Sequence, residues 1–132
     1  MYRHTRIAVP MFALAHAALL AFVVAVPAAT ADDGQAAFNN HCRTCHSTKA
    51  GDNRLGPTLY KIFGAKAAAA PGYASYSLGL SSSGITWDEA TLENFIANPD
   101  AVIPNNNMKP YMGITDAAVR RKIIEFLKSD RG

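Results

Sequence analysis

The apolar positions of the chain fall into three segments with helical spacing. The first predicted helix covers about Gly34 to Cys45, because several residues recur on one side of it at intervals of three and four. These residues are Ala37, Phe38, His41, Cys42 and Cys45. The pattern therefore predicts a helix that leads directly into a cysteine–histidine pair.

The second predicted helix begins near the sequence Thr-Trp-Asp-Glu at 86–89. This sequence matches a capping box, in which the Thr86 hydroxyl accepts from the backbone N–H of Glu89 and the Glu89 side chain reaches back. One apolar face follows, made by Leu92, Phe95 and Ile96. Pro99 predicts the end of this helix, because the residue before a proline avoids the α conformation.

The third predicted helix starts after Thr115 and runs to about Ser129. Its apolar residues recur at helical intervals, and the charged residues between them are mostly directed outward. The apolar positions are Val119, Ile123, Phe126 and Leu127. No strand pattern is evident, so the fold class predicted is all-α, with about three main helices.

Long stretches rich in glycine, proline, serine and asparagine separate these helices. Such residues mark turns and loops, and they lie at 50–53, 56–57, 71–72, 81–84 and 104–107. Loops this long within a compact domain count against an ordinary helical bundle. We therefore expect something other than protein to fill the centre of the domain.

The N-terminal segment has the pattern of an export signal. Arg3 and Arg6 precede an apolar run from Ile7 to Val26, and Ala29-Thr30-Ala31 matches an A-x-A cleavage site. The predicted organisation is a cleavable signal peptide at 1–31 and one domain at 32–132. A membrane anchor is the alternative, since the run is long enough to span a bilayer, but Pro10 and His16 favour cleavage.

Composition narrows the class of protein. The chain has 132 residues and is 17% charged and 49% hydrophobic, which is enough for one small domain. After cleavage its net charge would be about +1. A disordered acidic chain and a polybasic nucleic-acid-binding protein are both excluded by this balance.

The candidate chemistry lies in Cys42-Arg43-Thr44-Cys45-His46, which has the C-x-x-C-H spacing of a haem c attachment site. Two cysteines on one turn can form thioethers with the two vinyl groups of a haem. The next residue then places an imidazole under the iron, so His46 is the expected proximal ligand. One covalent haem c is the cofactor expected.

The cysteine pair could also serve one of three different purposes. A thioredoxin-like C-x-x-C requires a βαβ context that this pattern lacks. A plain disulfide would not require His46. A zinc site needs a fourth ligand, and His41 is the only other histidine after the signal segment.

The sixth iron position decides between electron transfer and ligand chemistry. A thioether favours Fe(II) and closes the iron to oxygen or peroxide. Met108 and Met112 are the two methionines of the predicted domain, and both lie in a non-periodic loop well after Cys45. Either one could supply the sulfur.

The order of these motifs resembles class I cytochrome c, of the mitochondrial cytochrome c and bacterial cytochrome c2 type, over 32–132. Gly34 and Phe38 resemble the N-terminal helix of the family, which packs across the C-terminal helix. Gly56-Pro57-Thr58-Leu59 resembles the segment whose proline carbonyl accepts a hydrogen bond from the proximal imidazole. The resemblance implies a small cytochrome c fold, with helices and long loops wrapped around one haem.

The resemblance also assigns roles beyond the attachment site. Tyr76 and Trp87 match positions that bind a buried haem propionate, and Pro57 matches the partner of His46. Pro99, Pro104 and Met108 match the approach to the methionine ligand. Met108 is thus the axial ligand that the resemblance implies, with Met112 as its substitute.

Three positions depart from the family pattern. Phe95 stands where the family usually has a tyrosine that hydrogen-bonds the methionine sulfur. Ala65 stands near the place of an arginine at the propionates, and Leu80 replaces a common asparagine. All three changes remove polar partners from the expected surroundings of the haem.

The predicted function is a periplasmic one-electron carrier of the respiratory chain, monomeric and without catalytic residues. The resemblance implies a quinol–cytochrome c reductase as donor, and a terminal oxidase, photosynthetic reaction centre or nitrogen-oxide reductase as acceptor. The alternatives are a five-coordinate haem protein that reacts with or senses peroxide, NO or CO, and an anchored subunit of a larger oxidoreductase.

The family docks through a ring of lysines, whereas few basic residues are available here. They are Lys49, Lys61, Lys66, Lys109, Arg43 and Arg54. With a net charge near zero, electrostatic steering toward a partner should be modest. We therefore expect apolar contacts to matter relatively more in docking.

Overall fold

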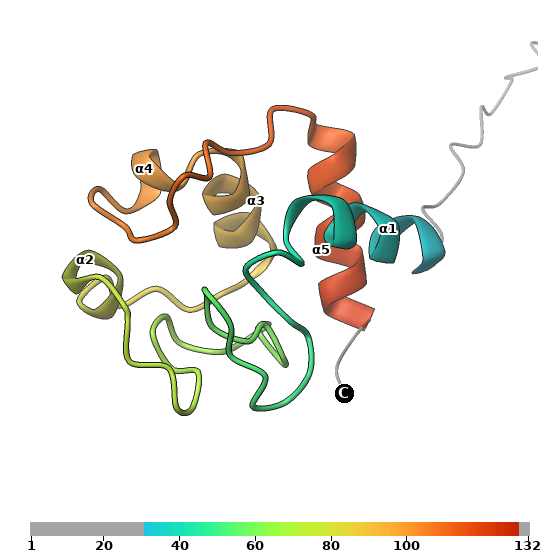
Figure 1. The fold of residues 1–132 in the computed structure, drawn as a ribbon. Coiled ribbons are helices and arrows are strands. Elements are labelled where there is room, and N and C mark those ends of the chain that lie inside the picture. Colours follow the sequence, from blue (N-terminus) through green and yellow to red (C-terminus); the bar gives the residue numbers. More distant parts are fainter. Residues whose placement is uncertain (1–30, 130–132) are drawn as a thin grey trace, which may run out of the picture.

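The computed structural model describes residues 31–129, and within them the only regular elements are five α-helices (Figure 1). They are α1 (Ala31–His41), α2 (Leu78–Ser81), α3 (Glu89–Ala97), α4 (Pro99–Val102) and α5 (Ala117–Ser129). One isolated bridge pairs Lys66 with Thr86. The expected all-α fold class is confirmed. The export signal at 1–31 lies almost wholly outside the described residues.

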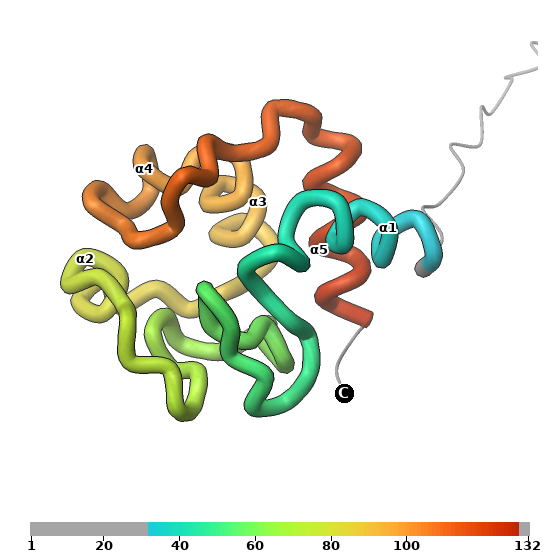
Figure 2. The backbone as a smooth tube through the Cα atoms, in the orientation of Figure 1, coloured from blue at the N-terminus to red at the C-terminus, as the bar shows by residue number. Residues whose placement is uncertain are grey.

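The two terminal helices cross and pack against each other, and α3 packs against α5 and α4 (Figure 1). The tube in Figure 2 shows that the long segment 42–77 and α2 form the opposite side of the molecule. The polypeptide therefore wraps around a centre rather than stacking helix on helix. None of the described helices has the length and apolar character needed to cross a membrane.

The contact between α1 and α5 is close because Gly34 has no side chain. Phe38 is buried, and its ring lies 5.3 Å from that of Phe126, between ring centroids. Ile123 beside it on α5 is fully buried. The expectation that Gly34 and Phe38 lie on a helix that crosses the C-terminal helix is confirmed.

Gly34→Ala is expected to lower the free energy of unfolding by about 1–3 kcal/mol, the usual cost of overpacking. A Cβ at this position would lie 2.7 Å from the backbone oxygen of Lys122 and 2.7 Å from Cβ of Phe126. Denaturant titration of the purified protein measures the loss. Gln35→Ala, at the exposed neighbouring position, is the control, and an equal effect of both variants would contradict the prediction.

The helix boundaries differ from the sequence expectation at two places. The first helix runs from Ala31 to His41, not from Gly34 to Cys45. The capping box of α3 is formed by Asp88 and Thr91 rather than by Thr86 and Glu89: Thr91 N donates to Asp88 Oδ1 at 2.8 Å, and Asp88 N donates to Thr91 Oγ1 at 2.8 Å. The end of α3 before Pro99 and the last helix agree with expectation.

Candidate functional site

A cavity of about 1010 Å³ occupies the centre of the domain and is lined by residues from most of the chain. Cys42, Cys45, His46 and Met108 all line it. Much of the remaining wall is apolar, including Leu59, Ile62, Leu80, Trp87, Leu92, Phe95, Ile96, Ile123 and Leu127. Protein interiors are otherwise close-packed, so a cavity of this size indicates a large, mostly apolar ligand.

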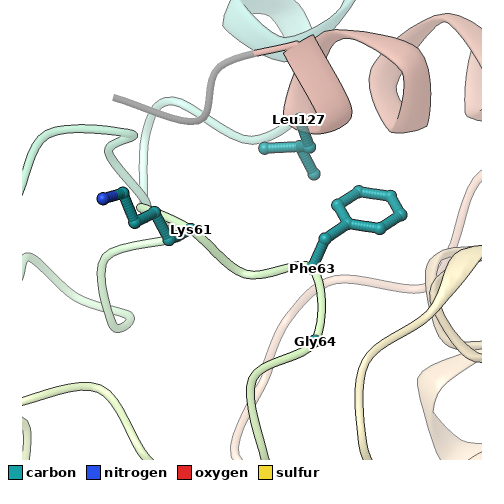
Figure 3. Close-up of a pocket in the computed structure, with 4 residues that line it drawn as sticks. All are labelled: Lys61, Phe63, Gly64 and Leu127. Atoms are coloured by element: carbon teal, nitrogen blue, oxygen red, sulfur yellow. The ribbon is translucent and has the colours of Figure 1, made fainter.

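A second hollow, of about 540 Å³, lies where the segment 61–64 meets the end of α5 (Figure 3). Lys61, Phe63, Gly64 and Leu127 line it. Leu127 also belongs to the wall of the large cavity. This hollow contains no cysteine, histidine or methionine, so the candidate chemistry lies in the large cavity alone.

The two cysteines lie on a turn that follows α1. Cys45 N and His46 N both donate to Cys42 O, at 3.1 and 2.9 Å, which closes the turn directly after the helix. Both thiols are free and half-buried. Burial, and secondarily the neighbouring Cys45, raises the pKa of the Cys42 thiol to about 12, so this thiol stays protonated at neutral pH.

These surroundings support neither a redox-active cysteine pair nor a zinc site. Reactive redox cysteines have a lowered pKa, which is the opposite of what Cys42 shows. The described part of the chain contains no strand for a βαβ unit and no cluster of His, Cys, Asp and Glu that could hold a metal ion. His41, which a zinc site would need as its fourth ligand, is exposed.

His46 is held in one orientation by the segment that follows it. Its Nδ1 lies 2.7 Å from the carbonyl oxygen of Pro57, which can only accept, so Nδ1 carries the proton and Nε2 keeps a lone pair. The side chain is 7% exposed, and this burial lowers its pKa despite the opposing effect of the hydrogen bond to Pro57. His46 is therefore a neutral imidazole at neutral pH, the form that binds metals.

Gly56 allows this close approach. A Cβ on Gly56 would lie 2.8 Å from Nδ1 of His46, too close for a real side chain. Gly56 N also donates to Cys45 O at 2.8 Å, which joins the two segments on either side of the imidazole. The glycine of the Gly-Pro pair is required because the ring packs directly against its backbone.

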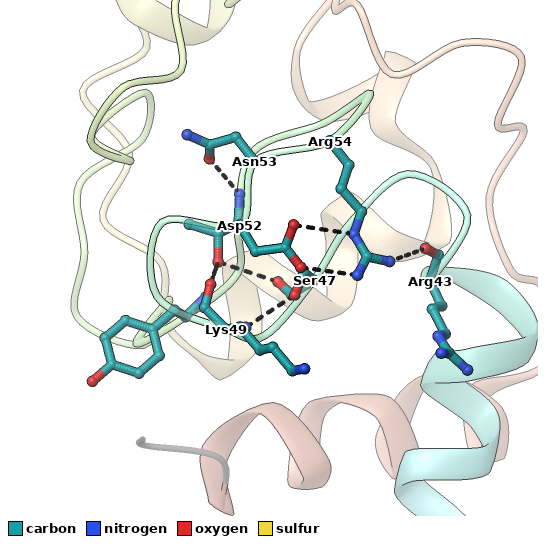
Figure 4. A network of polar contacts seen from close by, with 8 residues as sticks. Arg43, Ser47, Lys49, Asp52, Asn53 and Arg54 are labelled. Atoms are coloured by element: carbon teal, nitrogen blue, oxygen red, sulfur yellow. Dashed lines mark hydrogen bonds and ion pairs between the residues drawn. The ribbon is translucent and has the colours of Figure 1, made fainter.

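A polar network holds the segment 47–58 in place (Figure 4). Thr58 Oγ1 donates to Lys49 O at 2.7 Å, and Thr58 N donates to Asn53 Oδ1 at 2.9 Å. Arg54 pairs with Asp52 at 2.9 Å and donates to Arg43 O at 3.2 Å. The Arg54 hydrogen bond is the main reason that the pKa of Asp52 is lowered. The network fixes the chain next to Pro57 and so fixes its carbonyl.

The two methionines of the loop are placed differently. Met108 is half-buried, packs against the hydrophobic core and lines the cavity. The side chain of Met112 is 81% exposed and does not belong to the cavity wall. Of the two candidate sulfurs, only that of Met108 belongs to a residue of the cavity that also contains His46.

Residues 31–130 match the protein-family model described as Cytochrome c. Cytochrome c2 iso-1 of Magnetospirillum fulvum is 43% identical over 98 residues, which cover 74% of this chain and 97% of the relative. The chain belongs to the cytochrome c family.

Further relatives agree with this assignment. Cytochrome c2 of Rhodomicrobium vannielii is 35% identical over 124 residues, covering 91% of this chain and 94% of the relative. The solved structure of cytochrome cH from Methylobacterium extorquens superposes with a TM-score of 0.68 at 40% identity, and covers 75% of this chain and 97% of that one. The fold expected from the resemblance, a small cytochrome c fold, is thereby confirmed.

As a cytochrome c, the protein carries covalently bound haem c and transfers electrons rather than catalysing a reaction. The site fits that cofactor: one large and largely apolar cavity is bordered by two free thiols, a neutral imidazole and a thioether. The thiols stand at the C-x-x-C-H spacing. The match rests on donor chemistry and cavity size together.

The two residues expected at the propionates, Tyr76 and Trp87, both line the cavity of this cytochrome. Tyr76 Oη accepts from Ala70 N at 3.1 Å, and burial raises the pKa of its hydroxyl. Trp87 is buried and meets Phe95 edge-on, with ring centroids 5.1 Å apart. Their side chains share the wall that Leu80 and Ala65 also form.

Two residues of the site carry no signal in the sequence pattern. Tyr111 lines the cavity, and its hydroxyl donates to Ile96 O at 2.7 Å; burial raises the pKa of that hydroxyl well above its usual range. Asn106 lines the cavity as well and is buried although polar. Both lie in the non-periodic loop around Met108, where only the methionines stand out as candidate ligands.

Proposed function

We propose that this cytochrome is an exported one-electron carrier whose haem iron is bound by His46 and Met108. The carrying observation is the Nδ1–Pro57 hydrogen bond, which leaves Nε2 of His46 available in the same cavity that Met108 lines. Thioethers from Cys42 and Cys45 would attach the haem, with Tyr76 and Trp87 beside its propionates. Phe95 and the other apolar side chains would pack on its faces.

Bound haem supplies a single-electron couple between Fe(III) and Fe(II). The protein contributes fixed ligands: the Pro57 carbonyl holds the His46 tautomer and makes the imidazole more basic. The soft sulfur of Met108 favours the reduced form and raises the potential. Burial of His46 among packed side chains keeps water away and leaves little to rearrange when the charge changes.

The proposed cellular place is the periplasm, with residues 1–31 removed as a signal peptide. The family model begins at residue 31, and the Magnetospirillum relative matches over 98 residues that make up 97% of its own length. Both observations support a unit close to 32–132. Mass spectrometry of the purified protein tests this: a mature N-terminus at Asp32 is expected, and a retained 1–31 segment would favour an anchored subunit instead.

The ligand assignment is tested by the optical spectrum of the purified protein in both oxidation states. A weak sulfur-to-iron charge-transfer band in the oxidised form, with no binding of CO to the reduced form, is the result expected. Absence of the band together with ready CO binding would overturn the proposal. A five-coordinate haem protein that binds or senses small ligands would then be the better account.

The proposed partners are membrane redox complexes: a quinol–cytochrome c reductase as donor, and a terminal oxidase or reaction centre as acceptor. Contacts with such complexes are small and transient. Two basic side chains flanking the proposed haem ligands are already paired within the chain, Arg54 with Asp52 and Lys109 with Asp100. They contribute little free positive charge to docking.

We therefore predict a weak salt dependence of electron transfer. Raising the ionic strength from about 0.01 to 1 M shortens the screening length from about 30 to about 3 Å, and strong steering would lose 10- to 1000-fold in rate. Here less than about a tenfold change is expected. Stopped-flow reduction by the quinol–cytochrome c reductase of the same membranes measures it, and a larger loss would show that docking is electrostatic.

A further inference from the structure

Asn106 is a buried amide whose polar atoms are all engaged, two bonds donated and one accepted. Its side chain is 5% exposed. Nδ2 donates to Asp100 Oδ1 at 2.8 Å and to Ile103 O at 3.0 Å, while Oδ1 accepts from Met108 N at 3.0 Å. Because two of these partners only accept and the third only donates, the amide fits in one orientation.

Asp100 on α4 is the anchor of this arrangement. Its Oδ1 accepts from Asn106 Nδ2 and also from Nζ of Lys109. Asn106 and Lys109 lie on the two sides of Met108 in the sequence. The loop is therefore tied to one carboxylate both before and after the methionine.

The backbone at Met108 is restrained in addition. Lys109 N donates to Asn107 O at 2.8 Å, which closes a three-residue turn centred on Met108. Asn107 Nδ2 donates to Ser75 O at 3.1 Å, which links the loop to the segment before α2. With the bond from its own N–H to Asn106, Met108 has little freedom to turn its side chain out of the cavity.

We propose that Asn106, anchored on Asp100, is a positioning residue that holds the Met108 thioether on the haem iron. The inference rests on the proposed His46/Met108 ligation. Opening of the loop requires Asn106 to give up its bonds to Asp100 and Met108 together. The two residues thereby keep the iron closed to external ligands.

The rate at which CO binds to the reduced, haem-bound protein tests this role, because CO enters only while Met108 is displaced. Asn106→Leu has a similar size and none of the three bonds. It is expected to speed CO binding about tenfold, the factor for one lost hydrogen bond to a charged group, and to weaken the sulfur-to-iron band. Asp100→Ala should do the same from the exposed side.

Two further variants separate positioning from general loss of stability. Asp100→Asn keeps an oxygen that can accept from Asn106 Nδ2 and should restore CO binding to within about twofold of the wild type. Thr91→Val removes the capping box of α3, so it lowers the unfolding midpoint without contacting the loop. Its CO binding rate should stay at the wild-type value.

Each outcome decides the matter. If Asn106→Leu and Asp100→Ala bind CO within twofold of the wild type, the inference is overturned while the ligation stands. If Thr91→Val speeds CO binding as much as Asn106→Leu, the effect is one of global stability and the inference is again wrong. If the wild type itself lacks the sulfur band, the proposed function fails. Should Asn106→Leu not fold, the comparison of Asp100→Ala with Asp100→Asn gives the answer.

Discussion

Met108→Ala is expected to lower the reduction potential of the haem by some tenths of a volt and to let the reduced protein bind CO. Axial ligands set haem potentials over a range of about 0.8 V, and the thioether favours Fe(II) over Fe(III). Removing it leaves His46 as the one strong protein ligand and opens the cavity side that Met108 lines. A potentiometric titration followed in the visible spectrum measures the shift, and the sulfur-to-iron band should disappear.

Met112→Ala is the matched control, since it removes a thioether from the same loop. The Met112 side chain is 81% exposed and lies outside the cavity wall, so neither the potential nor the band should change. A band that survives in Met108→Ala but is lost in Met112→Ala would assign the iron to Met112. That result would also require the loop to rearrange, because Tyr111 and not Met112 now lines the cavity.

The long helices were predictable because their apolar spacing is strong, but the start of α3 was not. Two overlapping sequences match a capping box there, Thr86 with Glu89 and Asp88 with Thr91. The backbone before the helix is held extended: Thr86 bridges Lys66, and Trp87 N donates to Ala65 O at 2.9 Å. This tertiary contact leaves Asp88 as the first position at which the helix can begin.

The early end of α1 has a similar cause. Helical spacing continues through Cys45 in the sequence, yet both Cys45 and His46 donate to Cys42 O and form a tight turn. The turn brings His46 back toward Pro57, which lies 11 residues further on. The helices α2 and α4 have only four residues each, too few to show any periodicity.

The site divides along the same line between local and tertiary information. The residues of C-x-x-C-H and the Gly56-Pro57 pair could be named from short motifs, because their chemistry depends on neighbours in the sequence. The role of Asn106 depends on Asp100, and that of Tyr111 on the carbonyl of Ile96. Sequence alone could not choose Met108 over Met112 without the family resemblance, whereas burial separates them.

The double variant Cys42→Ser, Cys45→Ser, prepared without haem, is expected to lose the native fold. Creating a cavity costs about 24 cal/mol per Å³, which for about 1010 Å³ extrapolates to roughly 24 kcal/mol as an upper bound. Small domains have only about 5–15 kcal/mol of stability in total. The side chains that line the cavity must therefore collapse inward or meet water when the haem is missing.

Far-UV circular dichroism and denaturant titration of the haem-free variant, beside the haem-bound wild type, measure this loss. Serine is close to cysteine in size, so the substitutions themselves remove little packing. Native helix content with a cooperative transition in the haem-free variant would contradict the prediction. The packing of α1 on α5 through Phe38 and Phe126 would then be enough to hold the fold, but that contact covers only one side of the cavity. The segment 42–77 has no helix to stabilise it, and we expect it to depend on the cofactor most.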